Sequence, residues 1–177
     1  AACPGCAALH QLGVPSALLS LVGNEPFAVL LADDLIWNRG PGALAQMVEL
    51  AERESASVIA VQDVPRDQTA SYGIVATREF SHHHGDISEI VEKPKPEVAP
   101  STLAVVGRYI LSPQIFEMLE ATRAGAGGEI QLTDGIAALL KQDRVLAYRF
   151  EGRRFDCGSR IGLVEATIQY ALEHDDL

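Results

Sequence analysis

Positive charge is scarce in this chain of 177 residues, which has 14 Lys and Arg against 24 Asp and Glu and a formal net charge of −10. Binding to nucleic acids depends on clustered Lys and Arg that neutralise phosphates, so the composition argues against a nucleic-acid partner. An anionic small substrate is compatible with this charge. It would need a local cation, either a well-placed lysine or a bound metal, to overcome the acidic background.

Long apolar runs are also missing. No stretch approaches the length of a membrane span, and no basic segment precedes a short apolar one as in a secretory signal. We therefore expect a cytoplasmic protein with no membrane partner. Cysteine is rare as well, because Cys3, Cys6 and Cys157 form an odd set without a disulfide framework, and reduced thiols are expected.

Cys3 and Cys6 form a C-x-x-C pair, a spacing found in redox proteins and in zinc sites. A redox pair follows a strand and opens a helix, and a zinc site needs two further ligands. Nothing precedes this pair, and the chain has no second C-x-x-C. A flexible or altered terminus is therefore favoured over a functional site.

Apolar residues are plentiful, at 47% of the chain, which suits one well-cored domain over residues 1–177. The most informative run is 26–36, where six consecutive apolar residues end at Asp33 and Asp34. Such a run predicts a strand covered on both faces of a parallel α/β sheet, with ligands collecting beyond its carboxyl end. Alternatively, one aspartate caps a turn and the other is solvated.

The rest of the chain alternates between segments with the apolar spacing of a helix and short apolar segments typical of strands. Residues 43–54 predict an amphipathic helix and 58–61 a buried strand, which together with the first strand give a right-handed parallel βαβ unit. Further strands are expected at 72–76, 87–92, 103–111 and 145–150, and further helices after 113, after 129 and after 159. The apolar face expected for the last helix consists of Ile161, Val164, Ile168 and Leu172.

Three local features leave alternatives open. His82, His83 and His84 favour a solvated hairpin tip over a metal site, because adjacent histidines on a loop point in different directions. The glycines of 125–128 could cradle a phosphate or serve as a plain hinge. Glu92 and Lys93 could accept sugar hydroxyl hydrogen bonds and meet a phosphate, respectively, or could form a solvated strand end.

Six short motifs occur one after another along the chain. They are P-F-A-V-L-L-A-D-D-L-I at 26–36, Y-G-I at 72–74, V-E-K-P-K at 91–95, V-G-R-Y at 106–109, G-E-I-Q-L-T-D at 128–134 and D-C-G at 156–158. In order and spacing, these motifs resemble those of the bacterial UTP–glucose-1-phosphate uridylyltransferases. The resemblance covers residue 22 to the C-terminus.

The resemblance implies a Rossmann-like α/β nucleotidyltransferase fold, in which helices flank a mixed sheet. It implies that Asp33 and Asp156 hold Mg²⁺, that Glu92 accepts sugar hydroxyls, and that Lys93 binds phosphate. By the same resemblance, the sugar pocket is lined by Gly73, Val105 and Gly107. Mg²⁺ suits such a site, because it prefers one or two carboxylates together with substrate phosphates.

The implied reaction transfers a uridylyl group from UTP to glucose 1-phosphate and gives UDP-glucose and pyrophosphate. The family's first strand and glycine-rich loop have no counterpart here, and residues 1–21 form a divergent start, so we expect a partial nucleotidyltransferase domain with impaired activity. The alternatives are a transferase for another sugar nucleotide and a non-catalytic assembly fragment. Missing strands expose apolar surface and unpaired backbone groups, so a homo-oligomer is expected.

Overall fold

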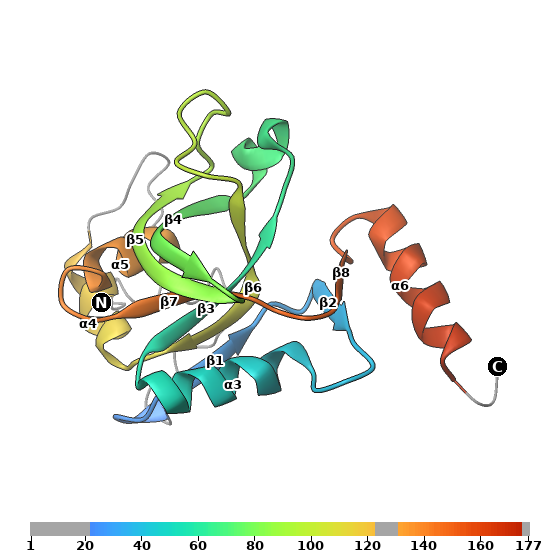
Figure 1. The fold of residues 1–177 in the computed structure, drawn as a ribbon, viewed down its shortest axis with the longest axis horizontal. Coiled ribbons are helices and arrows are strands. Elements are labelled where there is room, and N and C mark those ends of the chain that lie inside the picture. The colour runs from blue at the N-terminus through green and yellow to red at the C-terminus, as the bar shows by residue number, and fades with distance from the viewer. Residues whose placement is uncertain (1–21, 123–130, 175–177) are drawn as a thin grey trace, which may run out of the picture.

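The computed structural model describes residues 22–122 and 131–174. Within these residues the main sheet is mixed and has six strands, β1 (Phe27–Leu30), β3 (Ser57–Asp63), β4 (Gly73–Ser81), β5 (His84–Glu92), β6 (Leu103–Leu111) and β7 (Val145–Arg149). Their order is β1-β6-β3-β7-β5-β4, and β4 also pairs with β6. The predicted mixed α/β sheet is confirmed, and the extra pairing curls part of it into a small barrel that the sequence did not predict (Figure 1).

Helices lie on both faces of this sheet. α3 (Ala43–Glu54) covers one face, and α4 (Gln114–Ala121) and α5 (Leu132–Leu139) cover the other. The described residues also form α6 (Arg160–Leu172) and a 3₁₀ helix, η2 (Arg66–Ser71). A separate two-stranded antiparallel ribbon is formed by β2 (Asp34–Trp37) and β8 (Arg153–Asp156). Every helix and strand named from the sequence after residue 40 has a counterpart in the described part of the chain.

Two apolar clusters explain why the strands are continuous apolar runs. On one face, Met47 and Leu50 of α3 pack with alternate residues of β3, including Val58. On the other face, α4 and α5 pack with the intervening residues of β3, Ile59 and Val61. Because successive side chains of a strand point to opposite faces, a strand covered on both sides must be apolar at every position.

The prediction for the first strand is wrong in part. β1 is a four-residue strand at the edge of the sheet, antiparallel to β6, and among its residues only Val29 is buried. The chain turns after Leu30, with the amide of Asp34 donating to the carbonyl of Leu31 at 3.3 Å, and then starts β2. β1 and β3 run parallel to one another as predicted, but β6 lies between them. The apolar run could not reveal this, because it does not say which strand lies on either side.

The last helix also differs from expectation. α6 forms where predicted, and Ser159 caps it by accepting a hydrogen bond from the amide of Gly162 at 3.1 Å. However, Ile161, Val164 and Ile168 are exposed, and the helix stands away from the sheet (Figure 1). None of the helices in the described ranges is long and apolar enough to cross a membrane.

The histidine segment forms the tip of the β4–β5 hairpin, as the sequence predicts. His82 has a positive φ of 55°, and the return strand starts at His84. The remaining local predictions, on Cys3 and Cys6, on residues 1–21 and on the glycines of 125–128, fall outside the described residues.

Candidate active site

The β2–β8 ribbon carries the two aspartates that were expected to bind metal. In its register Asp34 lies opposite Asp156, and the amide of Cys157 donates to the carbonyl of Asp33 at 2.7 Å, which extends the ladder by one step. Asp33 and Asp156, which are far apart in the sequence, therefore lie at the same end of one ribbon. The sequence placed Asp33 at a strand's carboxyl end but could not show this pairing.

The carboxylates of these aspartates face a common space beside Gly158. A Cβ placed on Gly158 would lie 3.1 Å from Oδ1 of Asp156 and 3.2 Å from Oδ2 of Asp33, so a side chain there would crowd both carboxylates. The amide of Gly158 also donates to Oδ1 of Asp156 at 3.1 Å. Both aspartates are exposed to solvent, as ligands of an exchangeable ion must be.

This donor set fits Mg²⁺. The described residues contain no group of three or more His, Cys, Asp and Glu side chains that could hold a metal by themselves. Mg²⁺ keeps several waters and commonly takes one or two carboxylates together with substrate phosphates, so two exposed carboxylates are sufficient.

A second cluster lies where β4 and β5 pair. Gly73 is opposite Glu92 in the register, and a Cβ on Gly73 would lie 3.3 Å from Oε2 of Glu92 and 3.7 Å from Cγ2 of Val105. Three residues expected to form the sugar pocket are thus brought together. The missing side chain of Gly73 leaves space beside a carboxylate that can accept hydroxyl hydrogen bonds.

Lys93 has an unusual backbone conformation, with a positive φ of 45°. Successive residues of a strand point to opposite faces, so a lysine continuing β5 would point away from Glu92. The positive φ turns the chain, and Nζ of Lys93 comes within 3.6 Å of Oε1 of Glu92 while 61% of the lysine side chain stays exposed. Such conformations are uncommon for residues other than glycine and cluster at functional sites.

Gly107 lies beside a different carboxylate from the one beside Gly73. A Cβ on Gly107 would lie 2.5 Å from Oδ2 of Asp34 and 2.6 Å from Cβ of Leu31. The amide of Gly107 donates to that same oxygen of Asp34 at 2.7 Å. The absence of a side chain at Gly107 therefore makes room for Asp34, whereas Gly73 leaves room beside Glu92.

Two residues without an individual role in the sequence interpretation also belong to this region. Cγ2 of Thr133 lies 3.1 Å from the position of a Cβ on Gly73, and its buried Oγ1 has no hydrogen-bond partner among the described residues. Tyr109 is buried, and burial raises the pKa of its hydroxyl, which the carboxylates of Glu92 and Asp34 raise further. Both residues stand inside motifs that carried the resemblance, but only the fold shows what they contact.

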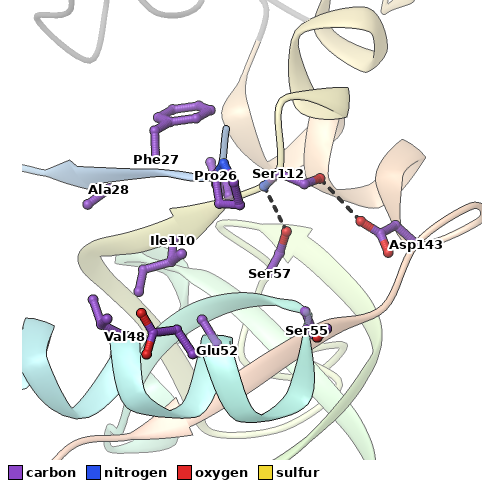
Figure 2. A pocket seen from close by; sticks show the side chains of 13 residues that line it. Pro26, Phe27, Ala28, Val48, Glu52, Ser55, Ser57, Ile110, Ser112 and Asp143 are labelled. Atoms are coloured by element: carbon purple, nitrogen blue, oxygen red, sulfur yellow. Dashed lines mark hydrogen bonds between the residues drawn. The ribbon is translucent and has the colours of Figure 1, made fainter. Parts of the chain in front are cut away.

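A cavity of about 620 Å³ opens elsewhere, between β1, α3 and the end of β6 (Figure 2). Ser57 and Ser112 line it, and Oγ of Ser57 accepts a hydrogen bond from the amide of Ser112 at 3.0 Å. It contains none of the residues expected to bind substrate or metal. Two carboxylates and a Glu–Lys pair make the region around β2, β8 and β5 the better candidate for chemistry.

Comparison with known proteins agrees with this fold. The family model described as nucleotidyl transferase matches residues 16–173. The chain therefore belongs to the nucleotidyl transferase family.

The curated relatives show which members of this family the chain is similar to, and they confirm the resemblance that the motifs indicated. The chain is 48% identical to a UTP–glucose-1-phosphate uridylyltransferase of Pseudomonas aeruginosa over 163 residues, which are 90% of this chain and 58% of that protein. It is 47% identical to UTP–glucose-1-phosphate uridylyltransferase 2 of Staphylococcus saprophyticus over 175 residues, which are 95% of this chain and 60% of that one. The chain thus spans less than two thirds of the length of these relatives.

Solved structures show the same similarity in three dimensions. A UDP-glucose pyrophosphorylase complexed with UDP-glucose superposes with a TM-score of 0.83 at 42% identity, covering 89% of this chain and 60% of that one. A UTP-bound UGPase from Acinetobacter baumannii superposes with a TM-score of 0.81 at 42% identity, covering 90% and 55%.

Proposed function

We propose that the chain carries the sugar-phosphate and metal part of a uridylyltransferase site. The proposed reaction transfers a uridylyl group from UTP to glucose 1-phosphate and gives UDP-glucose and pyrophosphate. The observation that supports it most is the arrangement of two clusters, Glu92 with Gly73, and Asp33 with Asp156. The substrates are taken from the names of the relatives and from the nucleotides in two related structures.

In this proposal each residue has a separate task. Glu92 accepts hydrogen bonds from sugar hydroxyls, and Lys93 offers a point charge to the phosphate. Asp33 and Asp156 would hold Mg²⁺, which when bound neutralises charge on the phosphates.

The bond changes need no nucleophile from the protein. An oxygen of the sugar phosphate attacks the α-phosphorus of UTP, the bond from that phosphorus to the bridging oxygen breaks, and pyrophosphate leaves with the bonding electrons. Such phosphoryl transfers depend on positioning and charge neutralisation, which are what carboxylates and a lysine can supply.

The direct test measures binding of UDP-glucose and of glucose 1-phosphate by calorimetry in the presence of Mg²⁺, followed by a pyrophosphate-release assay with UTP. We expect Glu92→Gln to weaken binding about tenfold or more, because hydrogen bonds to a charged acceptor contribute about 1.5–3 kcal/mol. Glu89→Gln is the matched control, since Glu89 lies on the same strand with its side chain exposed. If the unaltered chain binds neither ligand, the proposed function is wrong.

Association between copies is a second candidate role. The observation that favours it is the exposed apolar surface of α6 together with the free edge of β1 in the described part of the chain. The molar mass in solution, measured by light scattering across a range of concentrations, tests it. A monomer at every concentration would exclude this role.

A further inference from the structure

Asp34, the neighbour of the proposed metal ligand Asp33, is a buried carboxylate with both oxygens in use. Its Oδ2 accepts from the amide of Gly107 at 2.7 Å, and its Oδ1 accepts from Nε of Arg154. The side chains of Asp34 and Arg154 are only 7% and 12% exposed. Asp34 is therefore a fixed internal contact, unlike the exposed Asp33 beside it.

The backbone around Asp33 is held by hydrogen bonds to three of its carbonyls. Arg108, on β6, donates to the carbonyl of Leu31 at 2.9 Å and also to the carbonyl of Asp34. The carbonyl of Asp33 itself accepts from the amide of Cys157 at 2.7 Å. The position of the Asp33 carboxylate is thus set by β6 on one side and by the end of β8 on the other.

Arg154 extends this contact toward the sugar pocket. Its guanidinium carbon lies 5.6 Å from the centre of the Tyr72 ring. Tyr72 directly precedes Gly73, and its carbonyl accepts from the amide of Lys93 at 3.0 Å. One ion pair therefore touches the ribbon that carries both metal aspartates and the strand ends that carry Gly73 and Lys93.

We propose that Asp34 and Arg154 are positioning residues that hold the Asp33–Asp156 carboxylates in register with the sugar-phosphate pocket. This inference rests on the proposed function. A buried ion pair adds little net stability, because the cost of removing two charges from water offsets most of their attraction. A role in geometry accounts better for a pair that lies within the ribbon and also contacts Gly107 of β6 and Tyr72, just before β4.

The consequence is a coupling between two ligands. Metal at Asp33 and Asp156 should strengthen binding of glucose 1-phosphate, and the ion pair should transmit that effect. Coupling between sites is reciprocal and commonly amounts to a factor of about 5–150 in affinity. Loss of the pair should reduce this factor while each ligand alone still binds.

The experiment compares the unaltered chain with the double variant Asp34→Asn/Arg154→Leu, which removes both charges and leaves no buried charge alone. The matched control is Asp86→Asn/Arg144→Leu, which removes an ion pair between exposed residues far from the site. Mn²⁺ replaces Mg²⁺ so that its binding can be followed by electron paramagnetic resonance. The affinity for glucose 1-phosphate is measured by calorimetry with Mn²⁺ and with EDTA.

We expect Mn²⁺ to strengthen glucose 1-phosphate binding about tenfold in the unaltered chain and in the control, and less than about twofold in the double variant. Binding in EDTA and the melting temperature should change little. Full coupling in the double variant would overturn the inference and leave the proposed function intact. No binding by the unaltered chain would overturn both.

A conservative variant covers the case in which the double variant does not fold. Arg154→Lys keeps the charge beside Asp34 but loses the planar guanidinium over Tyr72. A positioning role predicts an intermediate coupling factor with a nearly unchanged melting temperature. The inference would be overturned if the coupling factor of Arg154→Lys and that of the exposed control variant were both equal to that of the unaltered chain.

Discussion

The helices α5 and α6 both have apolar residues at helical spacing, but only those of α5 are packed against another surface. Leu132, Ile136 and Leu139 of α5 are buried against α4 and the sheet. In α6, by contrast, the side chains of Ile161, Leu163, Ile168 and Leu172 are 53–78% exposed. Periodicity therefore predicts that a helix forms and which side is apolar, but burial depends on what lies opposite.

The two helices also differ in how they are attached. α5 is held along its length by apolar contacts, whereas α6 is held most closely at its first turn, where Gly162 lies against the carbonyl of Asp156. Beyond that turn Ala166 is buried, and the other contacts include exposed polar ones, such as the bond from the hydroxyl of Tyr170 to the carbonyl of Ile36 at 3.3 Å. In the described residues, the contacts of α6 are therefore mainly with β8, next to the candidate site.

The largest expected effect comes from the same substitution made in each helix. Ile136→Ala should lower the free energy of unfolding by about 2–5 kcal/mol, because it leaves a cavity at a fully buried position. Ile168→Ala, at a position that is 54% exposed, should change it by less than about 0.5 kcal/mol. Chemical denaturation of both variants measures this. A similar loss in the two would mean that α6 is covered in solution.

A second substitution tests whether only the first turn of α6 matters to the site. A Cβ on Gly162 would lie 1.9 Å from the carbonyl oxygen of Asp156, so Gly162→Ala must move the helix away from β8. We expect a loss of about 1–3 kcal/mol in stability and weaker Mn²⁺ binding. Gly40→Ala is the control, because its Cβ would meet only Asn38 at 3.6 Å. Unchanged Mn²⁺ affinity in Gly162→Ala would separate α6 from the site.

The smallest expected effects come from two exposed ion pairs, one on the main sheet and one at the end of α6. Arg144 donates to Asp86 of β5, and this hydrogen bond holds the pKa of Asp86 below its ordinary value of 3.8. A lowered carboxyl pKa gives stability that is present above the ordinary pKa and is lost as pH falls through the lowered value.

Arg144→Gln should therefore cost less than about 1 kcal/mol at pH 7, because the pair is exposed, and the difference from the unaltered chain should shrink as the pH falls below the ordinary pKa of 3.8. Arg39→Gln removes the corresponding pair with Glu173 at the end of α6 and should have no measurable effect. Urea denaturation at several pH values checks both. A difference for Arg144→Gln that grows on acidification would contradict this account of Asp86.

Much of the fold follows from local pattern, and the failures have one cause. The runs at 58–61 and 103–111 became β3 and β6 because apolar strands covered on both faces are distinctive. The antiparallel pairing of β1 with β6, the exposure of α6 and the closure of β4 onto β6 were missed. Each depends on a partner distant in the sequence, about which local periodicity carries no information.

In the candidate site, too, some features could be expected from the motifs and others depend on residues that are distant in the sequence. Gly73, Glu92 and Val105 come together as the motifs suggested, and Asp33 and Asp156 face one space. Their convergence could not be derived from the residues alone, because it depends on the β2–β8 ladder, and the sequence interpretation predicted neither of these two short strands. The different neighbours of Gly73 and Gly107 likewise become visible only in the fold.

The strand β6 pairs with β1, β3 and β4, and it carries Val105, Gly107 and Tyr109 of the candidate site. Any local opening that frees this strand must break three ladders at once. Its amide protons should therefore exchange with solvent only when the whole domain unfolds, and much later than those of α6. The part of the candidate site on β6 is thus as stable as the domain itself. Motions that admit or release a ligand must come from the elements around this strand.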